Sequence, residues 1–407
     1  MTDVDKQTGK PFQAVAAMRP APKPPTSPAA RAWTAFCDRL KDAGHLILSQ
    51  PGAEEDLYQA ETLRYFAREL RAALDWDLDN ADPDFPRFTR NDDSGSGPTG
   101  PNLDNNYYFA RVRGDASYRV RIDTRTIDDI IIGISNAQWR NYGDFSLGDF
   151  QVGADGILEI TAAPERVAGN WIAMPADAMR LAIRVYYHDW ARDRPPDLTI
   201  ERIGAEGAPP PPAAADIAER LAAINDYLEN NPYGYPLFQL AYADQIPPNV
   251  MRPPVAIPGG GGAIQYGITR FRLAPDEALL IESDVPRARY WGFHTYTMPW
   301  YSQIDVANRI TALNDRQSRI DADGRVRYVV AHADPGVQNW LDTGGYPTGS
   351  VFYRWIWSQD APAPESRVVP LAQVRAHLPA DTPAFSVADR RAQLAARRLH
   401  LQRRLRA

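Results

Sequence analysis

The chain has 407 residues, of which 44% are hydrophobic and 24% are charged, and its formal net charge is −6. This length allows two or three domains, and the negative charge argues against nucleic acid as a partner of the body of the protein. The single cysteine, Cys37, excludes an internal disulfide and a metal site built from thiolates of this chain alone.

The N-terminal residues 1–28 are polar and rich in Pro and Ala, which predicts a flexible arm. They lack the basic segment and the apolar core of a signal peptide. No apolar run in the chain approaches the ~20 residues that a membrane span needs. We therefore expect a cytoplasmic protein without a transmembrane segment.

Residues 29–101 are expected to form a helical segment followed by a loop. Apolar residues recur at helical spacing in 29–48 and again in 54–74. Residues 80–101 are rich in Asp, Pro, Gly and Ser and show little periodicity, which is typical of a long loop.

The rest of the chain is dominated by short β-branched and aromatic runs that are broken by Gly, Asp and Pro, a pattern typical of strands. We expect a first β-sandwich at 102–203 and a second at 255–375. Residues 204–254 between them read as a linker with a helix at 216–228. Residues 384–407 predict a basic C-terminal helix, which either docks on its own protein or binds an acidic partner or a membrane surface.

The two strand-rich blocks resemble each other, which indicates an internal duplication. Residues 117–123 match 278–284 in pattern, and two further pairs of matched residues are Trp171 with Trp340 and Arg184 with Arg354. The sequence therefore predicts a mainly β fold with flanking helices and tandem, duplicated β-sandwiches.

The repeat also separates structural from functional candidates. Residues that recur in both copies are expected to serve the fold, whereas residues present in one copy are better functional candidates. His294 aligns with Gly133, and Asp342 aligns with Ala173.

Three segments of the second block carry a family resemblance: 289–296, 321–327 and 334–342, the last reading Asp-Pro-Gly-Val-Gln-Asn-Trp-Leu-Asp. The C-terminal third of the chain thereby resembles the family called domain of unknown function 1214, and residues 104–107 resemble the region that precedes this domain in longer members. The resemblance implies a jelly-roll-like β-sandwich. It implies no particular reaction, because a fold alone does not supply one.

The chain lacks a phosphate-binding loop, a nucleophile elbow and a His-Glu-x-x-His motif. His294 and His332 could share a metal ion on neighbouring strands, or each could be a lone, hydrogen-bonded core histidine. Without a tight His-x-His spacing we assign no metal site, and the sequence leaves any cofactor unknown. Asp342 lies beside an indole and a glycine turn, where desolvation would raise its pKa towards acid/base duty. Its structural alternative is to accept backbone N–H bonds in that turn.

A group of aromatic residues in the second block is expected to line a pocket, although strand alternation must divide it between two faces. One face belongs to the core, and the other could stack on a sugar, a terpenoid or another ring. The residues expected to bind substrate are Trp291, Tyr296, Trp300, Tyr301, Trp340 and Arg354.

Two functions of different class follow. In the first, the protein is an enzyme that acts on a small ring-bearing molecule by acid/base chemistry, with Asp342 and His294 as the reacting pair and His332 assisting. In the second, it is a non-catalytic module that binds a ligand or assembles as a homo-oligomer. Convergence of the three side chains at a cavity would favour the enzyme.

Overall fold

The computed structural model describes residues 24, 26–50, 56–90, 100–243, 245, 247–256 and 263–404. For residues 233–243 the description is confined to the backbone. The predicted arm at 1–28 lies almost wholly outside the described residues, and so does the 91–99 part of the predicted loop.

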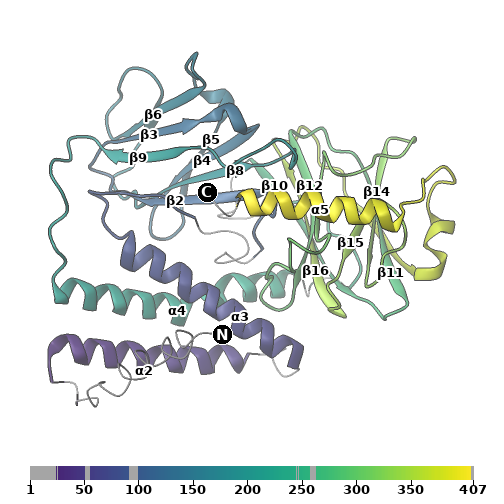
Figure 1. Cartoon of the computed structure of the whole chain (residues 1–407), viewed down its shortest axis with the longest axis horizontal. Coiled ribbons are helices and arrows are strands. Elements are labelled where there is room, and N and C mark those ends of the chain that lie inside the picture. Colours follow the sequence, from purple (N-terminus) through teal and green to yellow (C-terminus); the bar gives the residue numbers. More distant parts are fainter. Residues whose placement is uncertain are drawn as a thin grey trace, which may run out of the picture.

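Helices flank the β structure on two sides (Figure 1). The α-helices in the described part of the chain are α2 (Pro28–Leu48), α3 (Asp56–Ala73), α4 (Ala214–Ala243) and α5 (Val387–Arg404). A π-helical segment, η2 (Leu74–Asp79), continues α3. Helices α2, α3 and α4 pack together through apolar side chains such as Phe36, Ile224 and Leu228.

The helix predicted at 216–228 is longer in the structure, because α4 continues to Ala243. The polar Glu-Asn-Asn-Pro run that follows residue 228 predicts a helix end there. Helix α4 packs against α2, α3 and η2, and tertiary packing commonly overrides a local preference of this size.

The first sandwich combines a five-stranded and a four-stranded sheet. In spatial order the five-stranded sheet consists of β1 (Thr89–Arg90), β2 (Asn105–Arg111), β8 (Arg180–Tyr186), β4 (Asp129–Ser135) and β5 (Asn141–Ser146). The four-stranded sheet consists of β7 (Trp171–Ala173), β6 (Ile157–Ala163), β3 (Tyr118–Asp123) and β9 (Leu198–Arg202). Side chains such as Val120, Ile132 and Ile183 fill the space between them.

The second sandwich has two four-stranded sheets. One consists of β10 (Ile264–Arg272), β16 (Thr348–Ile356), β12 (Tyr290–Thr297) and β13 (Ala312–Asn314). The other consists of β15 (Trp340–Asp342), β14 (Arg325–Ala331), β11 (Glu277–Asp284) and β17 (Glu365–Pro370). Aromatic residues such as Phe293, Tyr328 and Tyr353 fill this core.

The strand order is the same in both sandwiches once the edge strand β1 is set aside. The order β2-β8-β4-β5 corresponds to β10-β16-β12-β13, and β7-β6-β3-β9 corresponds to β15-β14-β11-β17. In both copies one pair is parallel, β6 with β7 and β14 with β15. The predicted mainly β fold, with flanking helices and tandem sandwiches, is confirmed.

The two sandwiches meet through the outer faces of the sheets that contain β8 and β12. Tyr186 of β8 lies against Tyr290 of β12 with ring centroids 5.3 Å apart. An ion pair between Arg289 and Asp129 also crosses this junction. We call this contact region the junction.

Helix α5 runs across both sandwiches (Figure 1). Its buried side chains include Arg390, Arg397 and Arg404, whereas the apolar side chain of Val387 is 69% exposed. Arg390 pairs with Asp334, and the other two arginines donate to backbone carbonyls. The helix therefore docks on its own protein mainly through arginines.

Candidate functional site

Strand β12 divides its side chains between two faces, because successive residues of a strand point to opposite sides. Trp291 and Phe293 enter the core of the second sandwich. Tyr290, His294 and Tyr296 lie on the other face, where they contact residues of the first half of the chain. The junction therefore holds Tyr290, His294 and Tyr296 of this strand.

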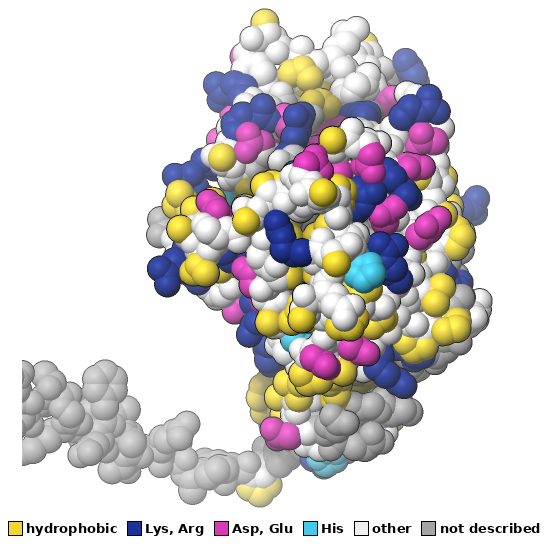
Figure 2. All heavy atoms as spheres, turned by 90° about the vertical axis from the view of Figure 1, so that its right-hand side faces the viewer, with side chains coloured by type: hydrophobic (Ala, Val, Ile, Leu, Met, Phe, Trp, Pro, Cys, Tyr) yellow, Lys and Arg dark blue, Asp and Glu magenta, His cyan; other side chains and the backbone are white. Residues whose placement is uncertain are grey.

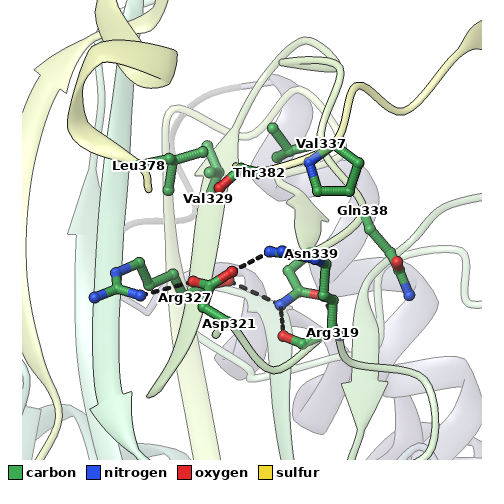
Figure 3. A pocket seen from close by; sticks show the side chains of 10 residues that line it. Arg319, Asp321, Arg327, Val329, Val337, Gln338, Asn339, Leu378 and Thr382 are labelled. Atoms are coloured by element: carbon green, nitrogen blue, oxygen red, sulfur yellow. Dashed lines mark hydrogen bonds and ion pairs between the residues drawn. The ribbon is translucent and has the colours of Figure 1, made fainter. Parts of the chain in front are cut away.

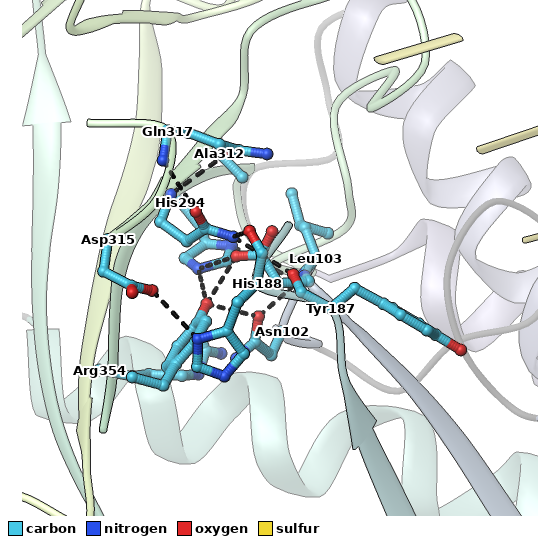
Figure 4. A network of polar contacts seen from close by, with 12 residues as sticks. Asn102, Leu103, Tyr187, His188, His294, Ala312, Asp315, Gln317 and Arg354 are labelled. Atoms are coloured by element: carbon cyan, nitrogen blue, oxygen red, sulfur yellow. Dashed lines mark hydrogen bonds and ion pairs between the residues drawn. The ribbon is translucent and has the colours of Figure 1, made fainter. Parts of the chain in front are cut away.

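A hydrogen-bonded group at the junction connects the two sandwiches (Figure 4). The Tyr290 hydroxyl lies 2.6 Å from Oδ2 of Asp104 and 3.2 Å from Nε2 of His294. The Leu103 amide donates to His294 Nδ1 at 3.4 Å, and the Trp190 indole donates to Asp104 Oδ1 at 2.9 Å. Both His294 and Asp104 have no exposed surface.

The hydrogen-bond network assigns the protons of this group. A backbone amide can only donate, so Nδ1 of His294 accepts and the neutral ring carries its proton on Nε2. Nε2 then donates to the Tyr290 oxygen, which donates to Asp104. Oδ1 of Asn102 lies 3.0 Å from the same hydroxyl, but the single hydroxyl hydrogen favours the closer, charged acceptor.

Burial shifts the pKa values of His294, Asp104 and Tyr290. It lowers the pKa of His294 well below its ordinary value, and the charges of Arg354 and Arg397 lower it further. Burial raises the pKa of Asp104, although the Tyr290 hydrogen bond opposes this effect. It also raises the pKa of Tyr290 well above its ordinary value. At neutral pH the histidine is therefore neutral and the tyrosine is protonated.

Arg354 borders this group on β16 (Figure 4). Its Nη1 donates to the Tyr296 hydroxyl at 3.2 Å, and its Nη2 donates to the Gly100 carbonyl at 2.5 Å. The Tyr296 hydroxyl donates in turn to the carbonyl of Pro101. The segment that precedes β2 is thus fixed against the second sandwich.

A family model described as a protein of unknown function (DUF1214) matches residues 271–359, which include Tyr290, His294 and Arg354. The crystal structure of an uncharacterized protein from Burkholderia cenocepacia is 30% identical in sequence, with a TM-score of 0.79, and the match covers 84% of this chain and 97% of that one. The chain belongs to the DUF1214 family.

A second solved structure, of a protein from Vibrio parahaemolyticus, is 12% identical with a TM-score of 0.44, over 82% of this chain and 100% of that one. The comparison with curated proteins gives no match. The junction group uses residues from inside and outside the segment that the DUF1214 family model matches, since Asp104 lies far upstream of it.

In this DUF1214 protein, the side chain of Asp342 stabilises a turn. Its Oδ1 accepts the Gly344 amide at 2.8 Å, and its Oδ2 pairs with Arg309 at 3.0 Å. These are the contacts of the structural alternative that the sequence left open for this residue.

His332 also bonds locally. Its Nδ1 lies 2.6 Å from the Thr343 hydroxyl, and its Nε2 lies 3.2 Å from the Leu273 carbonyl. The three residues expected to carry the chemistry, His294, His332 and Asp342, therefore bond to separate partners and not to one another.

The expected aromatic wall is divided among several sites. Trp291 lies in the core, Trp300 stacks on Tyr65 of α3 at 5.2 Å, and Trp340 packs beneath Arg390 of α5. The expected substrate-binding residues that lie at or beside the junction are Tyr296, Tyr301 and Arg354.

Sequence reasoning did not place Asp104 at a site, and it considered Tyr290 only as one aromatic residue of a possible pocket wall. The sequence nevertheless holds a signal for Asp104. Three polar residues in a row, Asp104 to Asn106, lie at the start of strand β2, and all three are buried. Such a run is costly in a core unless its groups are hydrogen bonded.

A shallow depression on the outer side of the second sandwich offers less chemistry (Figure 3). Its acidic residue, Asp321, pairs with both Arg319 and Arg327. Asn339 beneath it bonds to the backbone of the same two arginines, and Asn170 makes the matching bonds in the first sandwich. The repetition indicates that these polar groups serve the fold.

Figure 2 shows acidic and basic side chains interspersed over the end of the molecule at the second sandwich, without a continuous basic patch. Within the described ranges, no three His, Cys, Asp or Glu side chains gather as a metal site would require. None of the helices in this part of the chain is long and apolar enough to cross a membrane.

Proposed function

We propose that the protein is an enzyme that acts on a small ring-bearing organic molecule by acid/base chemistry at the junction. The observation that carries the proposal is the hydrogen-bonded series His294–Tyr290–Asp104, which joins titratable groups of both sandwiches. Asp342 is left outside this series, and Asp104 takes the role of its carboxylate.

The cost of burying these groups supports a functional role. A carboxylate and an imidazole lose hydration when they leave water, and apolar side chains of similar volume are often as stable or more so. Shifted pKa values in a compact group of acid and base residues are a recurrent property of active sites.

Each member has a chemical role that fits its environment. The neutral His294 donates its Nε2 hydrogen to the Tyr290 oxygen and so directs the hydroxyl hydrogen towards Asp104. Tyr290 gives its hydroxyl proton to Asp104 as its oxygen takes a proton from the substrate, so Asp104 is the base and Tyr290 is the relay. Asp104 holds that proton readily, because burial raises its pKa.

Buried amides near the series support the presence of a ligand or ordered water. Within the described residues, Nδ2 of Asn102 and both side-chain polar atoms of Asn106 have no hydrogen-bond partner, and the amide of Asn105 has only a weak contact with the Tyr186 hydroxyl, whose pKa it lowers. Buried polar atoms are satisfied in most proteins. Asn105 faces the junction, because it pairs with Tyr186 across β2 and β8.

The alternative is a non-catalytic module that binds the same kind of molecule or assembles into oligomers. It is favoured by the separate partners of His294, His332 and Asp342, and by the complete burial of His294. The enzyme would convert the bound molecule, whereas the module would bind it unchanged.

The deciding experiment incubates the purified chain with a metabolite extract and follows bound and converted compounds by mass spectrometry. We expect a compound that the wild type consumes and that His294→Gln and Tyr290→Phe leave intact. Tyr328→Phe is the matched control, since Tyr328 is fully buried in the second core with its hydroxyl on Ser318. Enrichment of a compound without conversion would favour the module, and absence of any bound compound would contradict both functions.

A further inference from the structure

Two arginines occupy matching positions in the two sandwiches, each opposite a tyrosine. Arg184 of β8 pairs across the sheet with Tyr107 of β2, and Arg354 of β16 pairs with Tyr266 of β10. The guanidinium carbons lie 6.0 Å and 5.6 Å from the respective ring centres. Residues directly opposite in an antiparallel pair project from the same face, so each arginine shares a face with its tyrosine.

Both arginine–tyrosine pairs face the junction. Tyr266 packs against a cluster that contains Ile131 and Tyr186 of the first sandwich. Ile131 is the direct cross-strand neighbour of Arg184. Tyr107 and Tyr266 are both among the groups that raise the pKa of Arg184 and of Arg354, so the two pairs lie in one neighbourhood of the junction.

In the described part of the chain, no carboxylate lies within ion-pair distance of either guanidinium group. Arg354 is only 3% exposed and donates to the Tyr296 hydroxyl and the Gly100 carbonyl, which are neutral. Arg184 is half-buried and makes no hydrogen bond or ion pair within the described ranges. Asp144 acts on Arg184 electrostatically, but its carboxylate accepts from Asn141.

Two like charges in a partly buried site repel each other and have lost hydration, so such charges are normally paired. Arg390 follows this rule, since Asp334 lies 2.9 Å from its guanidinium. Arg184 and Arg354 have no such partner among the residues that the structure describes, and a guanidinium is well suited to bind a carboxylate or phosphate through two parallel bonds.

We propose that Arg184 and Arg354 together bind the anionic group of a small ring-bearing organic acid, with Tyr107 and Tyr266 as contacts for its ring. This inference rests on the proposed function, because it places the substrate of the junction site. Arg184 supplies the solvent-accessible end of the site. Arg354 supplies the inner end, beside His294 (Figure 4), so an anchored acid would lie next to the proton-transfer series.

Isothermal titration calorimetry on the full chain tests the inference, with benzoate and phenyl phosphate as anionic probes and benzamide as the neutral one. We expect at least one anion to bind about tenfold more tightly than benzamide, and Arg184→Gln to weaken that binding by about tenfold or more. Arg121→Gln is the matched control, because Arg121 also lies on a strand of the first sandwich but pairs with Glu159. It should bind the anion as the wild type does.

Arg184→Lys keeps the charge but loses the planar pair of donors, so we expect it to bind the anion more weakly than the wild type and more tightly than Arg184→Gln. This variant also keeps the test valid if Arg184→Gln does not fold. Equal binding of benzamide and both anions, or anion binding that survives the loss of Arg184, would overturn the inference.

The same measurements separate this inference from the proposed function. Anion binding that depends on Arg184, in a protein that converts no metabolite, would support the anion site and contradict the enzyme. Conversion that depends on His294, together with equal binding of benzamide and the anions, would support the enzyme and overturn the anion site.

Discussion

Trp171 and Trp340 make the same hydrogen bond in the two sandwiches. Each indole donates from Nε1 at 3.1 Å, Trp171 to the carbonyl of Ala163 and Trp340 to that of Ala331, the last residues of β6 and β14. The bond links the short parallel strand to its neighbour, β7 to β6 and β15 to β14. The two copies therefore share this side-chain contact as well as their strand order.

The two tryptophans differ in burial, and this difference predicts unequal stability effects. Trp340 is 8% exposed, whereas Trp171 is half-buried beneath Arg166. We expect Trp340→Ala to lower the free energy of unfolding by roughly 3–5 kcal/mol, and Trp171→Ala by about half as much. Urea denaturation measures both. The Trp→Phe variants, which lose mainly the hydrogen bond, should each cost about 1 kcal/mol.

Asp342 provides a second stability test, because its two oxygens have different partners. Asp342→Asn keeps an oxygen for the Gly344 amide and loses only the pair with Arg309, whose side chain is 42% exposed. We expect it to cost roughly 0–1 kcal/mol. Asp342→Ala also loses the turn acceptor and should cost about 1–3 kcal/mol.

Thermal and urea unfolding of the two Asp342 variants would reveal the difference. Equal losses would show that the ion pair, and not the turn, is the important contact. If Asp342→Asn kept its melting temperature but abolished turnover in the metabolite assay, the original acid/base role of Asp342 would regain support.

Helix α5 stabilises the junction through Arg404, which has no exposed surface and donates to the Leu103 carbonyl at 2.8 Å. The amide of Leu103 donates to His294. We expect Arg404→Ala to lower the free energy of unfolding by about 2–3 kcal/mol, since a charged hydrogen bond and its buried stem are lost. The exposed neighbour Arg403 supplies the control, and Arg403→Ala should change stability by less than about 0.5 kcal/mol. Similar effects of the two variants in urea denaturation would argue against docking through Arg404.

The fold was predictable because its signals are local and occur twice. Strand runs with turn residues between them are visible in single segments, and the match of Trp171 with Trp340 aligned the copies without a structure. Helix α5 was predictable as a helix. Its buried face was not predictable. Long arginine stems are buried where backbone carbonyls accept their guanidinium groups, and a search for apolar residues at helical spacing does not detect a face of this kind.

The site was only partly predictable, since it depends on a contact between the copies. His294 was identified because the first sandwich has Gly133 at its position. Its partner Asp104 lies in the other sandwich, and the hydrogen bond from the Leu103 amide to the His294 ring spans 191 positions. A single sequence does not show which outer faces of two sandwiches meet. The carboxylate was therefore sought within the second sandwich, where Asp342 is a candidate.

Asp104 finally provides a test by pH. Burial raises its pKa in the folded state, so the folded chain keeps this proton at pH values where the unfolded chain has lost it. The favourable contribution is therefore complete below the unfolded pKa, near 4, and is lost as the pH rises through the raised, folded pKa. Asp104→Asn is neutral throughout and escapes this loss.

We therefore expect the free energy of unfolding of Asp104→Asn, relative to the wild type, to increase as the pH rises above about 4 and then to level off. Urea denaturation at intervals from pH 4 to 8 measures this difference. Asp123→Asn is the control of opposite sign, because hydrogen bonds from Arg125 hold the pKa of Asp123 at about 2. Its contribution is present above the unfolded pKa and is lost only as the pH falls towards 2, so the control difference should stay constant from pH 5 to 8. A flat or falling difference for Asp104→Asn would mean that Arg397 and Arg404 keep the buried carboxylate ionised, and Asp104 would then be a fixed counter-charge for α5 that could not accept the proton from Tyr290.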